Sequence, residues 1–172
     1  MRVIIVYTIM RLLTVISLFF ISTVFGDNMF LDKPAPPTYP KDLLNSTTGG
    51  PYTYSQSKHH FYGEAYDGTY IDTYGCCSGQ SGSCRNNPSC QCQVSVGPLP
   101  QGTYTLGNMM TFKGMPYCYE LYPSSSNSMC GRSGFLIHGG GCSGNPSEGC
   151  IVIEDENTRY KIKSGSTLKV VS

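Results

Sequence analysis

The chain is poor in charged residues and has no excess of either sign. Of its 172 residues only 13% are charged, and the formal net charge is +1. A chain this close to neutral lacks the basic surface that binds nucleic acid. So few charges, together with 20 Gly and 11 Pro, exclude a coiled coil. Long stretches of low hydrophobicity are also missing, which excludes disorder of the whole chain.

The sequence has no internal repeat, and no stretch of 12 residues shows helical periodicity with caps. From Tyr52 onward, short runs rich in Tyr, Thr, Val and Ile alternate with turn-forming residues, which is typical of strands. The sequence therefore predicts one all-β domain, a barrel or sandwich. We expect strands at 61–66, 69–74, 92–96, 102–106, 118–121, 134–138, 151–154, 159–163 and 167–171, with a hairpin turn at 155–158.

Residues 1–26 have the pattern of a signal peptide. Their only charges are Arg2 and Arg11, and residues 12–25 are almost wholly apolar, as in a signal-peptide core. We predict cleavage before Asp27 and hence a secreted, extracellular protein with no stable membrane association. The alternative is an uncleaved membrane anchor, which would have to bury Arg11. Cleavage changes the formal charge from +1 to −1, because both basic residues of the leader are removed.

Residues 27–50 follow as a proline-rich segment, with small polar residues between Pro34, Pro36, Pro37 and Pro40. Prolines spaced in this way favour an extended, flexible linker over a packed element. We therefore place the folded domain at 51–172.

The nine cysteines are too many for an ordinary cytosolic protein and indicate an oxidising compartment. Five of them lie between positions 76 and 92, where few apolar residues are available to form a core. Disulfides, each stabilising by about 2–4 kcal/mol, would hold such loops, and four of them would leave one thiol free. The alternative is a zinc cluster, but no Cys-x-x-Cys pair occurs. We predict no metal and no cofactor, and leave the pairing open.

One pair of residues stands out as a possible reactive site. The apolar run 135–137 leads into His138 and three glycines, and Cys150 follows Gly149 just before another apolar run. Two adjacent strands would bring the imidazole within reach of the sulfur and increase its thiolate fraction. The glycines would leave room for a peptide and let N–H groups face a developing oxyanion. The alternative is that Cys150 forms an intermolecular bridge and His138 is a surface strand end.

Several motifs in the same order resemble the L,D-transpeptidases of the YkuD-like fold. They are Ser78-Gly79-Gln80, the segment GPLPQGTY at 97–104, the segment GRSGFLIHG at 131–139, and the pattern S-x-G-C-I at 147–151. The resemblance covers about residues 62–171. Among the L,D-transpeptidases, the chain most resembles the subfamily of type VI secretion effectors. It implies a YkuD-like β-sandwich or barrel with long disulfide-stapled loops.

The resemblance also implies an activity, in which a cysteine forms an acyl-enzyme with peptidoglycan stem peptides. The enzyme would be an L,D-transpeptidase or L,D-carboxypeptidase that acts on muropeptides as a monomer. The implied roles are Cys150 as nucleophile, His138 as base, the Gly139 carbonyl as its support, the N–H groups of Gly149 and Cys150 as oxyanion hole, and Arg132, Ser147 and Tyr104 as substrate-binding residues.

Two features depart from this family pattern. Glu148 stands where many relatives have histidine, and a carboxylate near the sulfur would raise the pKa of the thiol. Cys142 lies in the glycine loop, and a bridge between Cys142 and Cys150 would block the nucleophile until it was reduced. The alternative function is therefore a non-catalytic peptidoglycan-binding or structural disulfide-rich extracellular module.

Overall fold

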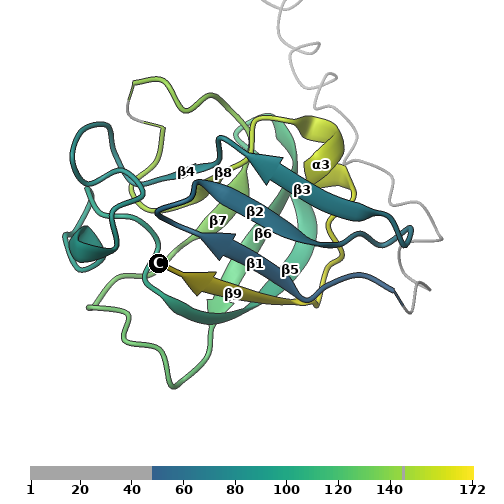
Figure 1. Ribbon diagram of the computed structural model, residues 1–172, viewed down its shortest axis with the longest axis horizontal. Helices are drawn as coiled ribbons and strands as arrows, with labels where there is room; N and C mark the ends of the chain where they lie inside the picture. The colour runs from purple at the N-terminus through teal and green to yellow at the C-terminus, as the bar shows by residue number, and fades with distance from the viewer. Residues whose placement is uncertain (1–47, 145) are drawn as a thin grey trace, which may run out of the picture. The chain divides into compact units, whose positions relative to one another are not determined.

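The computed structural model describes residues 48–144 and 146–172 (Figure 1). The predicted signal peptide and residues 27–47 of the predicted linker lie outside this part. All the strands described belong to one sheet, in the order β3-β2-β1-β9-β5-β6-β7-β8-β4. The elements are β1 (Tyr52–Ser55), β2 (His60–Glu64), β3 (Tyr70–Tyr74), β4 (Cys77–Ser78), the 3-10 turn η1 (Pro88–Cys90), β5 (Gly102–Phe112), β6 (Met115–Pro123), β7 (Leu136–His138), β8 (Ile151–Val152), the short helix α3 (Glu156–Tyr160) and β9 (Thr167–Val171).

The sheet is strongly curled, and its two edge strands are neighbours in the chain. β3 and β4 stand at opposite ends of the strand order, yet only Gly75 and Cys76 separate them in sequence. A two-residue connection forces the edges to approach each other, which gives the half-barrel seen in Figure 1. The all-β prediction is thus confirmed.

The concave side of the sheet encloses a core rich in aromatic side chains. Alternate residues of a strand point to the same face, so β1 buries Tyr52 and Tyr54 while β7 and β8 contribute Ile137 and Ile151. Tyr52 stacks on Phe61 of β2 with ring centroids 5.4 Å apart. This packing fixes which residues of β7 and β8 face away from the core.

Several local predictions are wrong. β1 and β4 were not expected, residues 92–96 form turns, residues 159–163 contain no strand, and no hairpin turn forms at 155–158. Asp155 is the N-cap of α3, because its carboxylate accepts a hydrogen bond from the Thr158 N–H at 2.8 Å. The same polar residues that suggested a hairpin turn therefore begin a helical turn.

The described end of the predicted linker, residues 48–50, is hydrogen-bonded to the domain. The Thr48 hydroxyl donates to the Tyr66 carbonyl at 2.8 Å, and the Gly50 N–H donates to the Glu64 carbonyl at 2.7 Å. Within the described residues, no helix has the length and apolarity that crossing a membrane requires.

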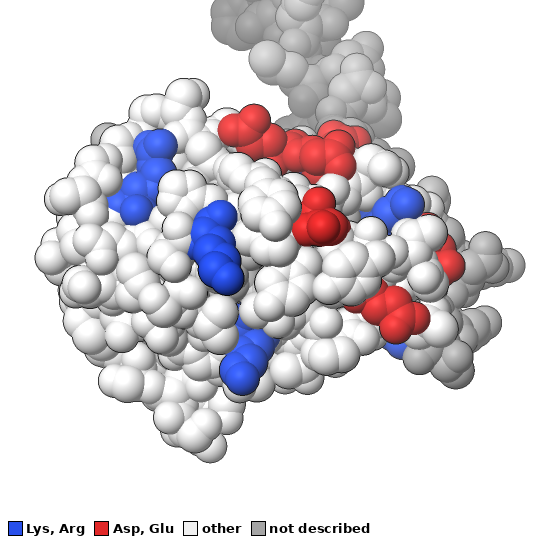
Figure 2. Space-filling view, in the orientation of Figure 1, with Lys and Arg blue, Asp and Glu red and all other residues white. Residues whose placement is uncertain are grey.

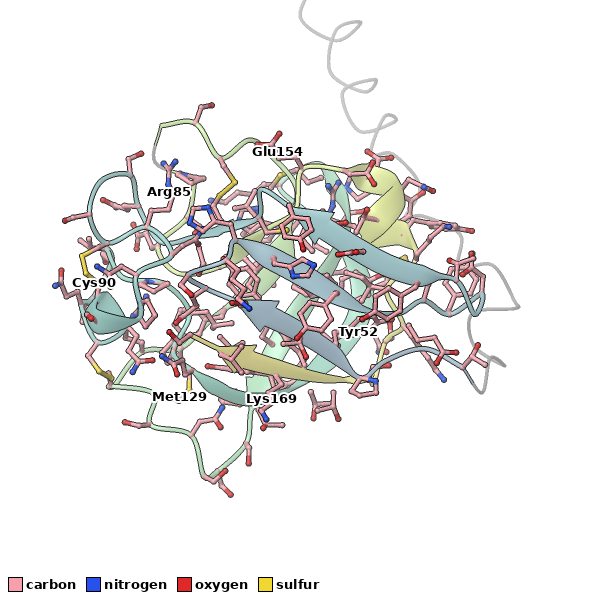
Figure 3. The ribbon with its side chains drawn as sticks, viewed as in Figure 1. Tyr52, Arg85, Cys90, Met129, Glu154 and Lys169 are labelled. Atoms are coloured by element: carbon pink, nitrogen blue, oxygen red, sulfur yellow. A yellow bond between two sulfur atoms is a disulfide. The ribbon has the colours of Figure 1, made fainter. Side chains whose placement is uncertain are left out.

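The cysteines form three disulfides, Cys77–Cys142, Cys84–Cys90 and Cys92–Cys130. The expectation of four bridges and one free thiol is wrong, because Cys76, Cys118 and Cys150 are all unpaired. Cys76 and Cys118 are buried and serve as small apolar side chains. The disulfides lie at the loop-rich side of the domain (Figure 3), and four of the five cysteines between 76 and 92 take part in them.

Candidate active site

The pairing of β7 with β8 places His138 and Cys150 on one face of the sheet. The two strands are parallel, with Ile137 opposite Ile151 and His138 opposite Val152. Ile137 and Ile151 face the core, so the alternation of side chains turns His138 and Cys150 to the other face. Continuing this register places Leu136 opposite Cys150, so His138 lies two residues further along the same face.

His138 is held in one orientation by its neighbour in sequence. Its Nδ1 lies 2.6 Å from the Gly139 carbonyl oxygen, and a carbonyl only accepts, so Nδ1 carries the proton. In the neutral ring the lone pair is then on Nε2. Burial lowers the pKa of His138 below its ordinary value, and the cations of Arg159 and Lys113 add to this effect against the Gly139 hydrogen bond.

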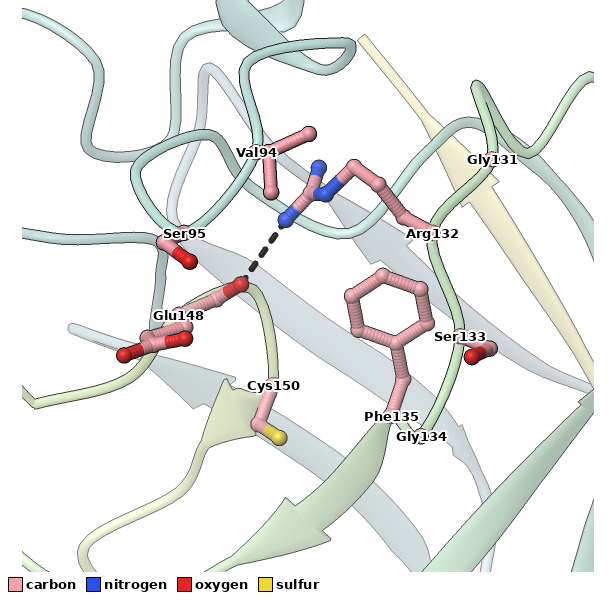
Figure 4. A pocket seen from close by; sticks show the side chains of 9 residues that line it. All are labelled: Val94, Ser95, Gly131, Arg132, Ser133, Gly134, Phe135, Glu148 and Cys150. Carbon is pink, nitrogen blue, oxygen red and sulfur yellow. Dashed lines mark hydrogen bonds between the residues drawn. The ribbon is translucent and has the colours of Figure 1, made fainter.

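Cys150 is unpaired and half-buried, and it lines a pocket of about 300 Å³. Figure 4 shows the sulfur with the neighbouring residues of the pocket. Burial raises the pKa of the thiol, while a backbone hydrogen bond from Leu136 and the Arg132 cation lower it. The pocket is lined by Val94, Ser95, Gly131, Arg132, Ser133, Gly134, Phe135, Glu148 and Cys150.

The directions of the two pKa shifts indicate that the Cys150 thiol and the His138 imidazole are both uncharged near neutral pH. The thiol keeps its proton because its pKa is raised, and the imidazole stays unprotonated because its pKa is lowered. Such a pair is suited to general-base chemistry, in which the proton leaves the sulfur as it attacks. A preformed thiolate–imidazolium ion pair does not fit these directions.

Arg132 ties together the two loops beside the pocket. The terminal nitrogens of its buried guanidinium donate to the carbonyl oxygens of Gln91, Gly97, Pro98 and Glu148 at 2.5–2.9 Å. The bond to Glu148 is drawn in Figure 4. The role of Arg132 in binding a substrate carboxylate stays a prediction. In this structure all four hydrogen bonds of its terminal nitrogens are to backbone carbonyl oxygens.

The loop before Cys150 is fixed by a second set of hydrogen bonds. The Ser147 hydroxyl donates to the Cys150 carbonyl at 2.8 Å and accepts from the Gly79 N–H at 3.1 Å. The Ser78 hydroxyl donates to the Gly149 carbonyl at 2.8 Å. Gly149 has φ +128°, and a Cβ there would lie 2.4 Å from the Arg132 guanidinium, so only glycine fits. Its N–H, predicted for the oxyanion hole, faces the Ser147 hydroxyl at 3.4 Å.

The side chains of two residues singled out from the sequence lie away from the Cys150 sulfur. Tyr104 is 1% exposed, its hydroxyl donates to the Pro100 carbonyl, and it does not line the pocket. The Glu148 side chain is exposed and points away from the Cys150 sulfur in Figure 4. Glu148 is not among the groups that shift the pKa of Cys150.

Disulfides brace the loops around His138 and Cys150. Cys92–Cys130 joins the loop that carries Val94 and Ser95 to the loop that carries Arg132. Cys77–Cys142 ties the glycine loop after His138 to β4. Cys142 is therefore engaged elsewhere and leaves Cys150 free.

Sequence reasoning missed two residues near His138. Cys118 of β6 lies across the antiparallel ladder from His138, since Tyr119 pairs with Ile137. Arg159 of α3 is 3% exposed and lies against Gly139. Neither residue belongs to a recognisable motif. Because a strand was expected at 159–163, the sequence gave no sign that Arg159 would be buried.

Charge and metal-binding groups add little to this site. On the face in Figure 2 the charged side chains are scattered, apart from acidic ones near Glu154 and α3. No group of three or more His, Cys, Asp or Glu that could hold a metal ion occurs among the described residues.

The domain is thus an all-β protein with a histidine at the end of β7 and a cysteine directly before β8, the adjacent parallel strand. The family model of the Tlde1 domain matches residues 72–171, and the chain belongs to this family of type VI secretion effectors. The match covers β7, β8 and the loops around the pocket. No curated protein and no solved structure matches the chain.

Proposed function

We propose that the protein is a secreted cysteine L,D-transpeptidase or L,D-carboxypeptidase with antibacterial action on peptidoglycan stem peptides. The observation that carries this proposal is the unpaired thiol of Cys150 at the pocket, on the same face as a His138 whose Nδ1 is held by Gly139. Membership in an effector family supports the antibacterial role. The disulfides support an oxidising compartment.

The proposed reaction begins with the neutral pair. The Cys150 sulfur attacks the carbonyl carbon of the third residue of the stem while His138 Nε2 takes the thiol proton. An S–C bond forms, the amide C–N bond breaks, and the imidazolium returns the proton to the departing D-amino acid. The backbone N–H groups of Gly149 and Cys150 are the proposed oxyanion donors.

The acyl-enzyme is then resolved by one of two acceptors. Water releases the shortened stem, which is carboxypeptidase chemistry, whereas the amine of a D-amino acid or of a second stem gives transpeptidation. In either case His138 takes a proton from the acceptor and returns it to the sulfur, so that the enzyme is regenerated.

The test is incubation of the protein with purified muropeptides, followed by mass spectrometry of the products. We expect loss of tetrapeptide species, with a covalent adduct on Cys150, and no turnover by Cys150→Ala. Cys76→Ala is the matched control, because that thiol is unpaired but buried away from the pocket. Wild-type protein that matches Cys150→Ala while still binding muropeptides would support the non-catalytic binding module instead.

A further inference from the structure

A buried cation lies behind the peptide that follows His138. The Arg159 side chain is 3% exposed, and its Nη1 donates to the carbonyl oxygens of Ile153 and Glu154 at 2.7 and 2.9 Å. Its nearest carboxylate, that of Glu156, is 4.0 Å away and mostly exposed. A buried guanidinium without a close counter-ion costs stability, so its position calls for an explanation.

Arg159 is linked to His138 in two ways, through hydrogen bonds of Ile153 and through the Gly139 peptide. The His138 carbonyl accepts from the Ile153 N–H at 3.0 Å, and the Ile153 carbonyl accepts from Arg159. The guanidinium packs on Gly139, and the Gly139 carbonyl holds His138 Nδ1 at 2.6 Å. A shift of the guanidinium would therefore be transmitted to the imidazole from two sides.

The glycine at position 139 is explained by this packing. Gly139 is not among the residues with positive φ, so its backbone does not require glycine. A Cβ at this position would, however, lie 2.7 Å from Nη2 and 2.8 Å from Cζ of Arg159. Contact this close is essentially never seen for a real Cβ, so the guanidinium and the Gly139 peptide fit together only without a side chain.

We propose that Arg159 is a positioning residue for His138, holding the Gly139 peptide so that its carbonyl keeps the Nδ1 proton and leaves Nε2 free for Cys150. This role rests on the proposed function. The other groups facing the imidazole are Cys118 from β6, Lys113 from the β5–β6 turn, and Cys150 beside β8. Cys118 also contacts this peptide, through a backbone hydrogen bond from Gly139 to its sulfur, whereas the guanidinium of Arg159 lies where a Cβ of residue 139 would be.

The test reads the imidazole directly by ¹⁵N NMR, which does not depend on turnover. The chain has only three histidines, so the His138 signals are assigned by their loss in His138→Gln. In Arg159→Gln we expect the Nδ1–H tautomer to lose its dominance and the pKa of His138 to rise, because the cation that lowers it is gone. Arg159→Lys should restore the titration in part, since it keeps the charge but loses the planar fork.

The matched control is Lys161→Gln, which removes a cation at the end of the same helix. Lys161 pairs with Asp67 at 3.4 Å and does not contact Gly139, so its removal should leave the His138 spectrum unchanged. If Arg159→Gln does not fold, Gly139→Ala disturbs the same contact from the other side and should shift the same signals. Muropeptide turnover in the folded variant should fall by about 10²-fold, the effect of a small misplacement of a reacting group.

A folded Arg159→Gln or Gly139→Ala variant with the wild-type tautomer and titration of His138 would overturn the positioning role, whatever its activity. Wild-type protein that does not convert muropeptides would instead overturn the proposed function. The NMR result would still decide the role of Arg159 in that case.

Discussion

Cys118 and His138 face each other across the β6–β7 ladder, while Cys150 lies on the other side of His138 and alone among the three free thiols lines the pocket. The imidazole thus stands between a buried sulfur and a half-buried sulfur that lines the pocket. Cys118 is fully buried, and its sulfur donates to the Met115 carbonyl at 3.3 Å. Access, rather than proximity to histidine alone, distinguishes the proposed nucleophile.

This difference predicts selective alkylation. With iodoacetamide we expect one adduct on the native protein, at Cys150, formed roughly tenfold or more faster than any at Cys76 or Cys118. Burial raises the pKa of the Cys76 thiol to about 12, so that thiol stays protonated. Peptide mapping by mass spectrometry checks the site, and alkylation in denaturant should label all three. Native labelling at Cys118 at the rate of Cys150 would contradict the structure.

The neutral resting pair predicts the acid limit of activity. The base must be unprotonated, and the pKa of His138 is lowered by burial, so the acid limb of kcat/KM should have its midpoint below about pH 6.5, the ordinary value for histidine. A preformed ion pair would behave differently, because its acid limb would follow the thiol. The measurement is a pH profile of muropeptide turnover, and a midpoint above the ordinary histidine value would count against general-base catalysis by His138.

Arg132 is predicted to be a major contributor to stability as well as to the site. Arg132→Met leaves four backbone carbonyls without their donor, two of them in fully buried bonds, and should cost about 3 kcal/mol or more. Urea unfolding gives the value. The control is Arg85→Met, whose bonds to Ser81 and Gly144 are exposed and should be worth about 1 kcal/mol or less.

The same substitution should alter the reactivity of Cys150. The Arg132 cation lowers the pKa of the thiol, so Arg132→Met should raise that pKa further. Alkylation of Cys150 in the folded variant should then be slower at a given pH. Faster alkylation would show that loosening of the loops outweighs the electrostatic effect.

The disulfides should differ in what they stabilise. Cys92–Cys130 spans 38 residues and Cys84–Cys90 spans 6, so the loop-closure relation predicts that removing the longer one costs about 1.5 kcal/mol more. Replacing each pair by serines and comparing thermal unfolding tests this. Because the longer bridge also joins the two walls of the pocket, its loss should reduce turnover more than loss of the shorter bridge. Equal effects on turnover would contradict a bracing role for Cys92–Cys130.

The sequence predicted correctly those features that depend on a short stretch of residues, such as the strands on either side of the site. Alternating runs such as 167–171 correctly predicted a strand, and the apolar runs before His138 and after Cys150 predicted two adjacent strands. The unpaired state of Cys150 also agrees with the sequence interpretation. These features depend on short segments, so they can be read without knowledge of the fold.

Features set by distant contacts were not predictable in the same way. The number of disulfides depended on whether Cys76 and Cys118 would be buried in the sheet, which spacing does not reveal. The turn at 155–158 became a helix start because Asp155 found a local N–H partner. The sequence placed Arg159 in a strand at 159–163 and gave it no role, since only the folded chain brings Gly139 to it.

The last of the described strands, β9, lies inside the sheet rather than at an edge. It pairs in parallel with β1 and antiparallel with β5, so the N-terminal strands have no bonded link to β5 until Thr167–Val171 is in place. A nascent chain that has not reached β9 would expose two unsatisfied strand edges. The domain therefore completes its fold only after its synthesis, and a chain shortened before residue 167 should aggregate rather than form a smaller domain.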